Sequence, residues 1–289
     1  MTESAVGPGA HHVDPHAFDP SWDEIDVALP LRSWTRNVPE SEGLILIDLA
    51  RDGMTVADWR TAADAALPHG DASYRQTLIR LVQRMFLDVE SDAIVETPFL
   101  RLIQDGDAEQ RHDLFFARYA LAHPWTLLAA RQLVLPGLLT SGEGATVSIE
   151  DWDAFVARFL EDKASDASRR KTRSTVIGTL MQLGVLERDG SSSSPTRLRR
   201  GQPAALAFAW AVCDQMVGEL RPREHLDWAT HRSDAAQLFA ILPEDAEDLL
   251  GHALAEDELL AIEVGGEPGV SPPASYGYAP LANEDIGEE

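Results

Sequence analysis

From about residue 40 onward, apolar positions recur with a helical period along most of the chain. The segment Ala72–Leu87 shows the pattern most clearly, because its apolar residues share one side of a helical wheel and its polar residues share the other. The apolar side holds Tyr74, Leu78, Ile79, Leu81, Val82, Met85 and Phe86. By the same pattern we expect helices at about 55–66, 92–103, 108–121, 124–139, 148–162, 170–183, 203–220, 233–241 and 244–256.

Local residue types predict where several of these elements begin and end. Thr55 with Asp58, and Ser148 with Asp151, have the spacing of helix caps, and Gly184 is typical of a left-handed helix stop. Short strands are expected at 185–188 and 196–200 around a turn, and again at 259–264 and 275–279. The predicted fold class is mainly α, with two or three small helix-turn-helix or winged-helix-like lobes and short β-hairpin wings.

Changes in composition predict the domain organisation. The order helix, helix, hairpin occurs twice, at 150–200 and at 233–280, and residues 140–147 have the composition of a linker. The expected parts are a disordered arm (1–28), an N-terminal helical, helix-turn-helix-like domain (29–140), a winged-helix-like domain (148–222), an acidic helical and hairpin extension (223–280) and an acidic tail (281–289).

Composition excludes several classes of protein. Of the 289 residues, 44% are hydrophobic, which is enough to build cores and excludes a wholly disordered chain. A single cysteine, Cys213, excludes a disulfide framework, and its apolar surroundings favour a core position over a nucleophile. No apolar run approaches the roughly 20 residues that span a bilayer, and the N-terminus lacks a signal-peptide pattern. We therefore expect a cytoplasmic protein.

The charge is strongly negative but unevenly distributed. The chain has 24 Lys and Arg against 48 Asp and Glu, a formal net charge of −24. Residues 233–289 hold 14 acids and no Lys or Arg, whereas residues 163–200 hold nine basic residues, Lys163 included, against three acidic ones, a net of +6. Such a basic island can face a polyanion, because fields between exposed charges fade over about 8 Å in physiological salt. The alternative is a solvated face whose arginines pair with nearby acids.

The basic island contains a helix followed at once by a hairpin, which is the arrangement of a winged helix. On the wheel of 171–183, the buried stripe is expected to hold Val176, Ile177, Leu180, Met181 and Leu183. The opposite, exposed stripe is expected to hold Lys171, Ser174, Thr175, Gly178 and Gln182. Gly178 in an exposed helix centre suggests either close approach of a ligand backbone or tight packing against another helix.

The residues of this helix and hairpin are the candidate DNA-binding site. They are Arg169, Arg170, Lys171, Arg173, Ser174, Thr175 and Gln182 on the helix, and Arg188, Arg197, Arg199 and Arg200 on the hairpin. A second candidate surface is the Ala72–Leu87 helix, through Arg80 and Arg84 with Gln76 and Gln83. The alternatives are a protein-docking module for the winged helix and a plain amphipathic surface helix for Ala72–Leu87.

Four segments resemble the BrxA family, an accessory component of bacteriophage exclusion (BREX) defence systems. They are SYRQTLIRLVQRM (Ser73–Met85), LIQDGDAEQRHDLFFARYALAHPW (Leu102–Trp125), SIEDWDAFVARFLEDK (Ser148–Lys163) and RKTRSTVIGTLMQLGVLE (Arg170–Glu187), and the similarity runs from about Leu31 to Leu220. The resemblance implies a mostly helical protein that binds double-stranded DNA without catalysis, and other phage-defence proteins as partners. Beyond Leu220 the acidic segment departs from the family pattern and makes a protein partner more plausible.

The sequence lacks the common catalytic motifs. It has no Gly-x-x-x-x-Gly-Lys-Ser/Thr loop, no His-Glu-x-x-His pair and no Gly-x-Ser-x-Gly elbow. His11, His12 and His16 suggest a disordered tract rather than a metal site, and His225 and His231 lack the spacing of metal ligands on one helix face. We therefore expect a non-enzyme with no cofactor and no metal. The alternative functions are an interaction adaptor acting through residues 233–289, and a transcriptional regulator of a defence operon.

Overall fold

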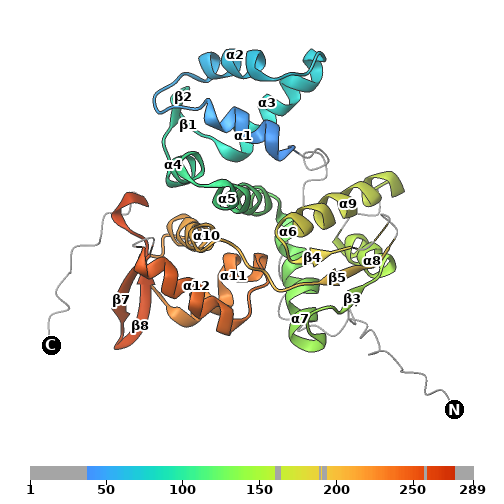
Figure 1. The fold of residues 1–289 in the computed structure, drawn as a ribbon, viewed down its shortest axis with the longest axis vertical. Helices are drawn as coiled ribbons and strands as arrows, with labels where there is room; N and C mark the ends of the chain where they lie inside the picture. Colours follow the sequence, from blue (N-terminus) through green and yellow to red (C-terminus); the bar gives the residue numbers. More distant parts are fainter. Residues whose placement is uncertain (1–37, 160–163, 189, 191–193, 257–258, 277–289) are drawn as a thin grey trace. The chain divides into compact units, whose positions relative to one another are not determined.

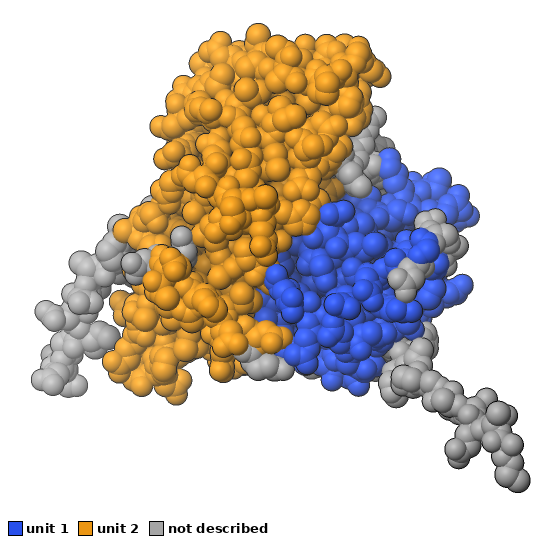
Figure 2. Space-filling view, in the orientation of Figure 1, with its two compact units in different colours: residues 1–37, 123–202, 237–242 blue, residues 38–122, 203–236, 243–289 orange. Residues whose placement is uncertain are grey.

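The computed structural model describes residues 38–159, 164–188, 190, 194–256 and 259–276. These residues are mainly helical, with small antiparallel sheets (Figure 1). They form two compact units, coloured separately in Figure 2. Unit 1 contains residues 123–202 and 237–242, and unit 2 contains residues 38–122, 203–236 and 243–276. The predicted arm at 1–28, the acidic tail at 281–289, the candidate Lys163 and His11, His12 and His16 lie outside the described residues.

Unit 2 begins with an N-terminal lobe, residues 40–95. Its elements are α1 (Glu40–Asp48), α2 (Val56–Ala66), α3 (Ala72–Phe86), β1 (Asp88–Glu90) and β2 (Ala93–Val95). The Thr55 side chain accepts a hydrogen bond from the Asp58 N–H at 3.1 Å, which confirms the predicted cap of α2. Thr55 also forms an isolated antiparallel bridge with Ala93, so its backbone acts as a third strand beside the β1–β2 hairpin.

Two helices follow this lobe and carry the centre of the unit 2 core. They are α4 (Pro98–Asp105) and α5 (Ala108–Leu121), and α5 opens with a capping box between Asp107 and Gln110. The Phe86 and Phe115 rings stack with their centroids 4.6 Å apart. Both side chains are fully buried. Burial of such rings contributes about 1.5–3 kcal/mol each.

The remainder of unit 2 is a C-terminal lobe, residues 205–271. Its elements are α10 (Ala205–Gly218), β6 (Glu224–His225), the π-helical turn η3 (Trp228–Arg232), α11 (Asp234–Leu238), α12 (Pro243–Ala255), β7 (Leu260–Val264) and β8 (Glu267–Ser271), before a 3-10 turn, η4 (Ala274–Tyr276). The last two residues of α11, 237 and 238, belong to unit 1, because that unit resumes at Gln237 and continues to Leu242. The sheet order is β6-β8-β7, all antiparallel. Cys213 is fully buried on α10, as expected.

Unit 1 contains a middle lobe, residues 124–198. Its elements are α6 (Pro124–Ala129), the π-helical turn η2 (Ala130–Val134), α7 (Leu135–Ser141), β3 (Thr146–Val147), α8 (Ile149–Phe159), α9 (Asp166–Gln182), β4 (Leu186–Glu187) and β5 (Thr196–Leu198). The sheet order is β3-β5-β4. Ser148 and Asp151 cap α8 reciprocally, as predicted. Trp152 is buried and its indole N–H donates to the Thr196 hydroxyl at 2.9 Å, which ties α8 to β5.

Within the described residues, one chain order occurs in all three lobes. Each lobe runs helix, strand, helix, helix, strand, strand, and in each sheet the last strand lies between the other two. In the N-terminal lobe the first strand is reduced to the Thr55–Ala93 bridge. The third helices of the lobes are therefore α3, α9 and α12, which hold equivalent topological positions.

Three predictions of secondary structure are wrong. The helix expected at 92–103 is instead β2 followed by α4, because Ser91 and Asp92 take positive φ values of 49° and 65° and close a tight hairpin. Thr97 then caps the restarted helix, with Pro98 in its first turn. Of the strand expected at 275–279, residues 275 and 276 belong to the 3-10 turn η4, and 277–279 lie outside the described residues. The strand that pairs with β7 is β8, since the positive-φ glycines at 265 and 266 turn the chain sooner. The linker at 140–147 ends in β3.

A glycine substitution tests the way segment 237–242 joins unit 1. A Cβ added to Gly201 would lie 1.8 Å from the Phe239 carbonyl oxygen, so one of the two backbones must move. We expect Gly201→Ala to lower the free energy of unfolding by about 1–3 kcal/mol, the usual cost of overpacking. The measurement is urea unfolding followed by circular dichroism.

The matched control is Gly251→Ala in the middle of α12, where an added Cβ meets nothing within 4 Å. This variant should gain up to about 1 kcal/mol from helix propensity. Equal stability of Gly201→Ala and the unsubstituted protein would contradict the close packing of Gly201 on Phe239.

Candidate nucleic-acid interface

The α9 helix is fixed at both ends by its own sequence. Ser165 accepts a hydrogen bond from the Ser168 N–H at 3.2 Å at the start. At the end, Gly184 takes a positive φ of 73°, its N–H donates to Met181, and the Val185 N–H donates to Leu180. This double pattern is a Schellman motif and confirms Gly184 as the helix stop. The chain then enters β4 directly, so helix and hairpin are rigidly connected.

The helix buries a wider face than the wheel predicts. Val176, Ile177, Leu180 and Leu183 are buried, as expected. Thr175 was expected on the exposed side and is 4% exposed, so it is removed from the candidate contacts; Met181 was expected in the core and is 37% exposed. The reason is that α6, α8 and β4 all pack against α9 and shift its buried face onto threonines.

Thr179, which is also buried, can enter the core because its hydroxyl has a backbone acceptor within the helix. The Thr179 hydroxyl donates to the Thr175 carbonyl oxygen at 3.0 Å. A hydrogen-bonded hydroxyl loses most of the penalty of leaving water, so it packs almost as an apolar residue would. Ser174, Lys171 and Gln182 remain exposed, as predicted.

Part of the positive charge of the hairpin is matched by carboxylates. Arg199 lies 3.1 Å from Glu143 and 3.4 Å from Glu187, and Arg197 lies 4.0 Å from the same Glu187. All these side chains are roughly half exposed, so each pair contributes little to stability. The pairs nonetheless lower the net positive charge that β5 presents. Arg200, the last cation of this group, is exposed.

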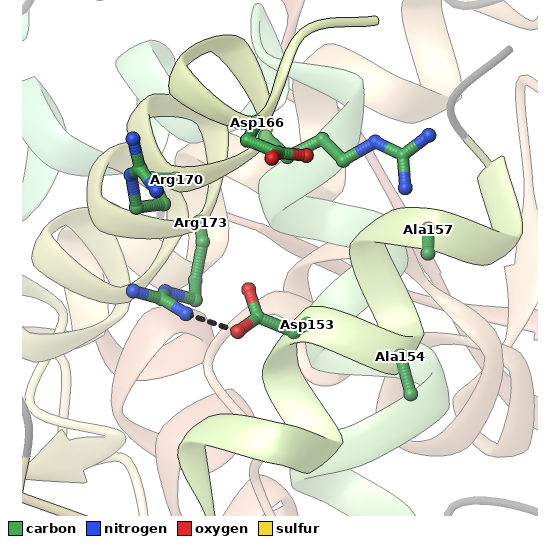
Figure 3. A pocket seen from close by; sticks show the side chains of 7 residues that line it. Asp153, Ala154, Ala157, Asp166, Arg170 and Arg173 are labelled. Carbon is green, nitrogen blue, oxygen red and sulfur yellow. Dashed lines mark hydrogen bonds and ion pairs between the residues drawn. The ribbon is translucent and has the colours of Figure 1, made fainter. Parts of the chain in front are cut away.

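The start of α9 carries cations that have no carboxylate partner among the described residues. Among the described residues, Arg169, Arg170 and Lys171 form no ion pair or side-chain hydrogen bond, and Arg170 and Lys171 are exposed. Arg173, one turn on, is held by Asp153 of α8, with Nη1 2.5 Å from Oδ2 (Figure 3). The candidate cations therefore include an unpaired group at the start of α9 and a paired group, which consists of Arg173 further along α9 and of Arg197 and Arg199 on the hairpin.

Arg188, at the end of β4, is in an unfavourable environment. Its Nε and Nη2 atoms are buried and have no acceptor in the part of the chain that the structure describes. Burial, and next the neighbouring Arg173 guanidinium, lower the pKa of Arg188. An unsatisfied buried donor costs about 1–3 kcal/mol, so an anion that reached Arg188 would relieve this cost.

A surface pocket lies between α8 and α9, beside these arginines. Its volume is about 570 Å³, and it is lined by Asp153, Ala154, Ala157, Asp166, Arg169, Arg170 and Arg173 (Figure 3). Three of the lining side chains are cationic and two are anionic. The lining thus has a net positive charge in a chain whose total charge is strongly negative.

The second candidate surface, on α3, is also exposed. Arg80 and Arg84 are exposed, and the Arg80 Nε donates to the Gln76 carbonyl oxygen at 3.1 Å. Gln83 accepts hydrogen bonds from Arg60 of α2 at 2.8 and 3.0 Å, which adds a third cation that the sequence pattern missed. The β1–β2 hairpin beside α3 carries the exposed acids Asp88, Glu90 and Asp92, unlike the arginine-bearing hairpin of the middle lobe.

The third equivalent helix, α12, has the opposite charge. Its exposed surface includes Glu247 and Asp248, and the helix contains no Lys or Arg. Within the described ranges no group of three or more His, Cys, Asp or Glu is arranged to hold a metal ion. None of the helices there is long and apolar enough to cross a membrane.

Comparisons with known proteins relate this chain to solved structures alone. No protein-family model matches it, and no curated protein does. It is similar to a structure titled "SspB crystal structure", with a TM-score of 0.55 and 15% identity over 82% of this chain and 81% of that chain. It is also similar to "Magnesium ion-bound SspB crystal structure", with a TM-score of 0.52, 16% identity and the same coverage. At these identities the similarity shows a shared fold.

The environment of Arg188 gives a prediction about stability. We expect Arg188→Met to raise the free energy of unfolding by about 1–3 kcal/mol, because it removes two buried nitrogens that lack acceptors and keeps an unbranched apolar side chain in place of the arginine stem. Urea unfolding measures the change. The control Arg170→Met removes an exposed arginine and should stay within about 0.5 kcal/mol of the unsubstituted protein. A destabilised Arg188→Met would mean that Arg188 already has a stabilising partner.

Proposed function

We propose that this chain is a non-catalytic accessory protein of a phage-defence system that binds double-stranded DNA, mainly through the phosphate backbone. The observation that carries the proposal is the unpaired cationic group Arg169, Arg170 and Lys171 at the exposed start of α9. The resemblance of Leu31–Leu220 to the BrxA family supports the phage-defence context.

The topology of the middle lobe supports a winged-helix mode of binding. Its chain order and its β3-β5-β4 sheet support this mode, in which α9 would enter the major groove and strands β4 and β5 would lie beside the adjacent backbone. In this mode the start of α9 and the hairpin both face DNA phosphates. The unpaired cations at the start of α9 would then make the main phosphate contacts, because Arg173, Arg197 and Arg199 are paired with carboxylates.

The strongly negative total charge does not oppose this mode. Exposed charges more than about 8 Å apart are largely screened at physiological salt, so the local cations decide the interaction. About three or four neutralised phosphates give a slope of log affinity against log salt of roughly −2.7 to −3.6. Such an interaction is tight at low salt and weak above physiological salt.

The exposed side chains of α9 favour backbone contacts over base reading. Ser174 and Gln182 are its exposed neutral polar residues outside the cationic start, and neither provides the bidentate fork that reads guanine. Gly178 fits the same interpretation. An added Cβ there meets nothing within 4 Å, so tight packing within the protein does not explain this glycine, and close approach of a ligand does.

A charge-reversal experiment tests the proposed interface. Arg170→Glu/Lys171→Glu should lower affinity for a 20-base-pair duplex at least tenfold and make the salt slope shallower by about 1.8, since two phosphate contacts are lost. Fluorescence anisotropy at several salt concentrations gives both quantities. The matched control is Arg223→Glu/Arg232→Glu, an equal charge change at exposed positions of the C-terminal lobe. Equal losses in both variants would place the binding surface elsewhere.

Gly178 gives an independent test. Gly178→Ala should stabilise the protein by about 1 kcal/mol through helix propensity, yet weaken duplex binding, because the methyl group holds the DNA backbone away from α9. Unfolding and anisotropy measurements on one preparation give both effects. Unchanged affinity would remove Gly178 from the interface.

A second candidate function is an adaptor that docks a basic protein partner. The observation that favours it is α12, which takes the topological position of α9 but exposes Glu247 and Asp248. The variant Glu247→Gln/Asp248→Asn separates the two functions. If the protein is an adaptor, this variant loses binding to the basic partner. If the protein binds DNA through α9, the variant keeps its affinity for duplex DNA. Removal of residues 233–289 is unsuitable, because α12 packs against α10 inside unit 2.

A further inference from the structure

The pocket between α8 and α9 combines a space, a set of cations and an internal competitor. Ala154 and Ala157 lie three residues apart, on one face of α8, and their short side chains leave the space open. Arg169, Arg170 and Arg173 line it from α9. Asp153, also on the lining, engages Arg173 at 2.5 Å (Figure 3).

We propose that this pocket binds one phosphate group, and that Asp153 competes with the phosphate for Arg173 and so limits affinity. The identity of the ligand as a DNA phosphate rests on the proposed function. The binding of phosphate itself does not, because it follows from the composition of the pocket.

Hydrogen-bond donors outnumber acceptors around this pocket, which favours the binding of an anion there. Asp153 occupies one guanidinium, that of Arg173, while Arg169 has a buried Nε without an acceptor in the described part of the chain. Burial, and next repulsion from the neighbouring Arg173, lower the pKa of Arg188. The Nε and Nη2 atoms of Arg188 also lack acceptors among the described residues. The lining therefore holds two carboxylates, Asp153 and Asp166, against three guanidinium groups, and the remaining donors suit a further anion.

Phosphate fits these donors better than a second carboxylate does. The peripheral oxygens of a phosphate group accept paired hydrogen bonds from more than one guanidinium, and inorganic phosphate also carries more charge than a carboxylate. Asp166, in the first turn of α9, opposes an anion, so the net attraction comes from the arginines. The expected site is thus a moderate one that Asp153 weakens further.

The first experiment changes the competitor. In the full chain, Asp153→Asn should raise affinity for duplex DNA about three- to tenfold and steepen the salt slope by about 0.9, because Arg173 becomes available for one more phosphate. The control Glu150→Gln makes the same charge change at an exposed position on the same helix, outside the pocket lining. If both variants change affinity equally, the effect is one of general charge and competition by Asp153 is overturned.

The second experiment fills the pocket without altering any charge. Ala157→Leu places a larger side chain into the lining at an exposed position. It should weaken duplex binding at least threefold while leaving the circular dichroism spectrum and the unfolding midpoint in chloride unchanged. If the spectrum of Ala157→Leu changes, Ala154→Leu is used in its place, because Ala154 lies on the same face of α8 and also lines the pocket.

Inorganic phosphate is the probe that separates this inference from the proposed function. At matched ionic strength, phosphate should raise the unfolding midpoint relative to chloride, and Ala157→Leu should abolish that rise. A rise that Ala157→Leu abolishes, together with no duplex binding, supports the pocket as a site for free phosphate and overturns the proposed function. Duplex binding that neither Asp153→Asn nor Ala157→Leu changes, without a phosphate-dependent rise, overturns the pocket and leaves the proposed function standing.

Discussion

The packing of α9 into the middle lobe decides which cations of this chain a ligand can reach. Three neighbouring elements bury its threonine and apolar face, so its arginines are distributed around what remains. Arg173 falls beside α8 and meets Asp153, whereas Arg170 and Lys171 point away from the buried face and stay exposed. The distribution of exposed and paired cations on α9 therefore follows from how the core is packed.

The three lobes show how little a topology determines by itself. Their chain order and sheet order agree, yet the third helix carries only basic charges in α3, basic charges and one acid in α9, and acids without Lys or Arg in α12. The hairpins vary independently, with arginines beside α9 and acids beside α3. A shared arrangement of elements supplies an exposed helix next to a hairpin, and the residues placed on them decide whether that surface attracts or repels a polyanion. Similarity to a solved fold likewise shows how the elements are arranged but not which charges they carry.

The sequence predicted best what depends on a few neighbouring residues. The caps at Thr55 and Ser148 and the stop at Gly184 were predicted because each acts through hydrogen bonds within about five residues. The hairpin at Ser91 and Asp92 was missed, since neither residue type requires the positive φ that closes the turn. The burial of Thr175 was missed too, because a threonine becomes a core residue only when several elements surround it.

The same distinction explains the candidate site. Residue types located the basic helix and hairpin, but not which carboxylates would neutralise them. Asp153 is 20 residues from Arg173, and the acids that face Arg199 come from two other segments of the middle lobe. These pairings arise only when the sheet and helices assemble. A local excess of arginine is thus evidence of a capacity to bind anions, and the three-dimensional balance of partners determines how much of that capacity is available. For this chain, the free part is concentrated at the start of α9, where an opposing phosphate also gains from the positive end of the helix dipole.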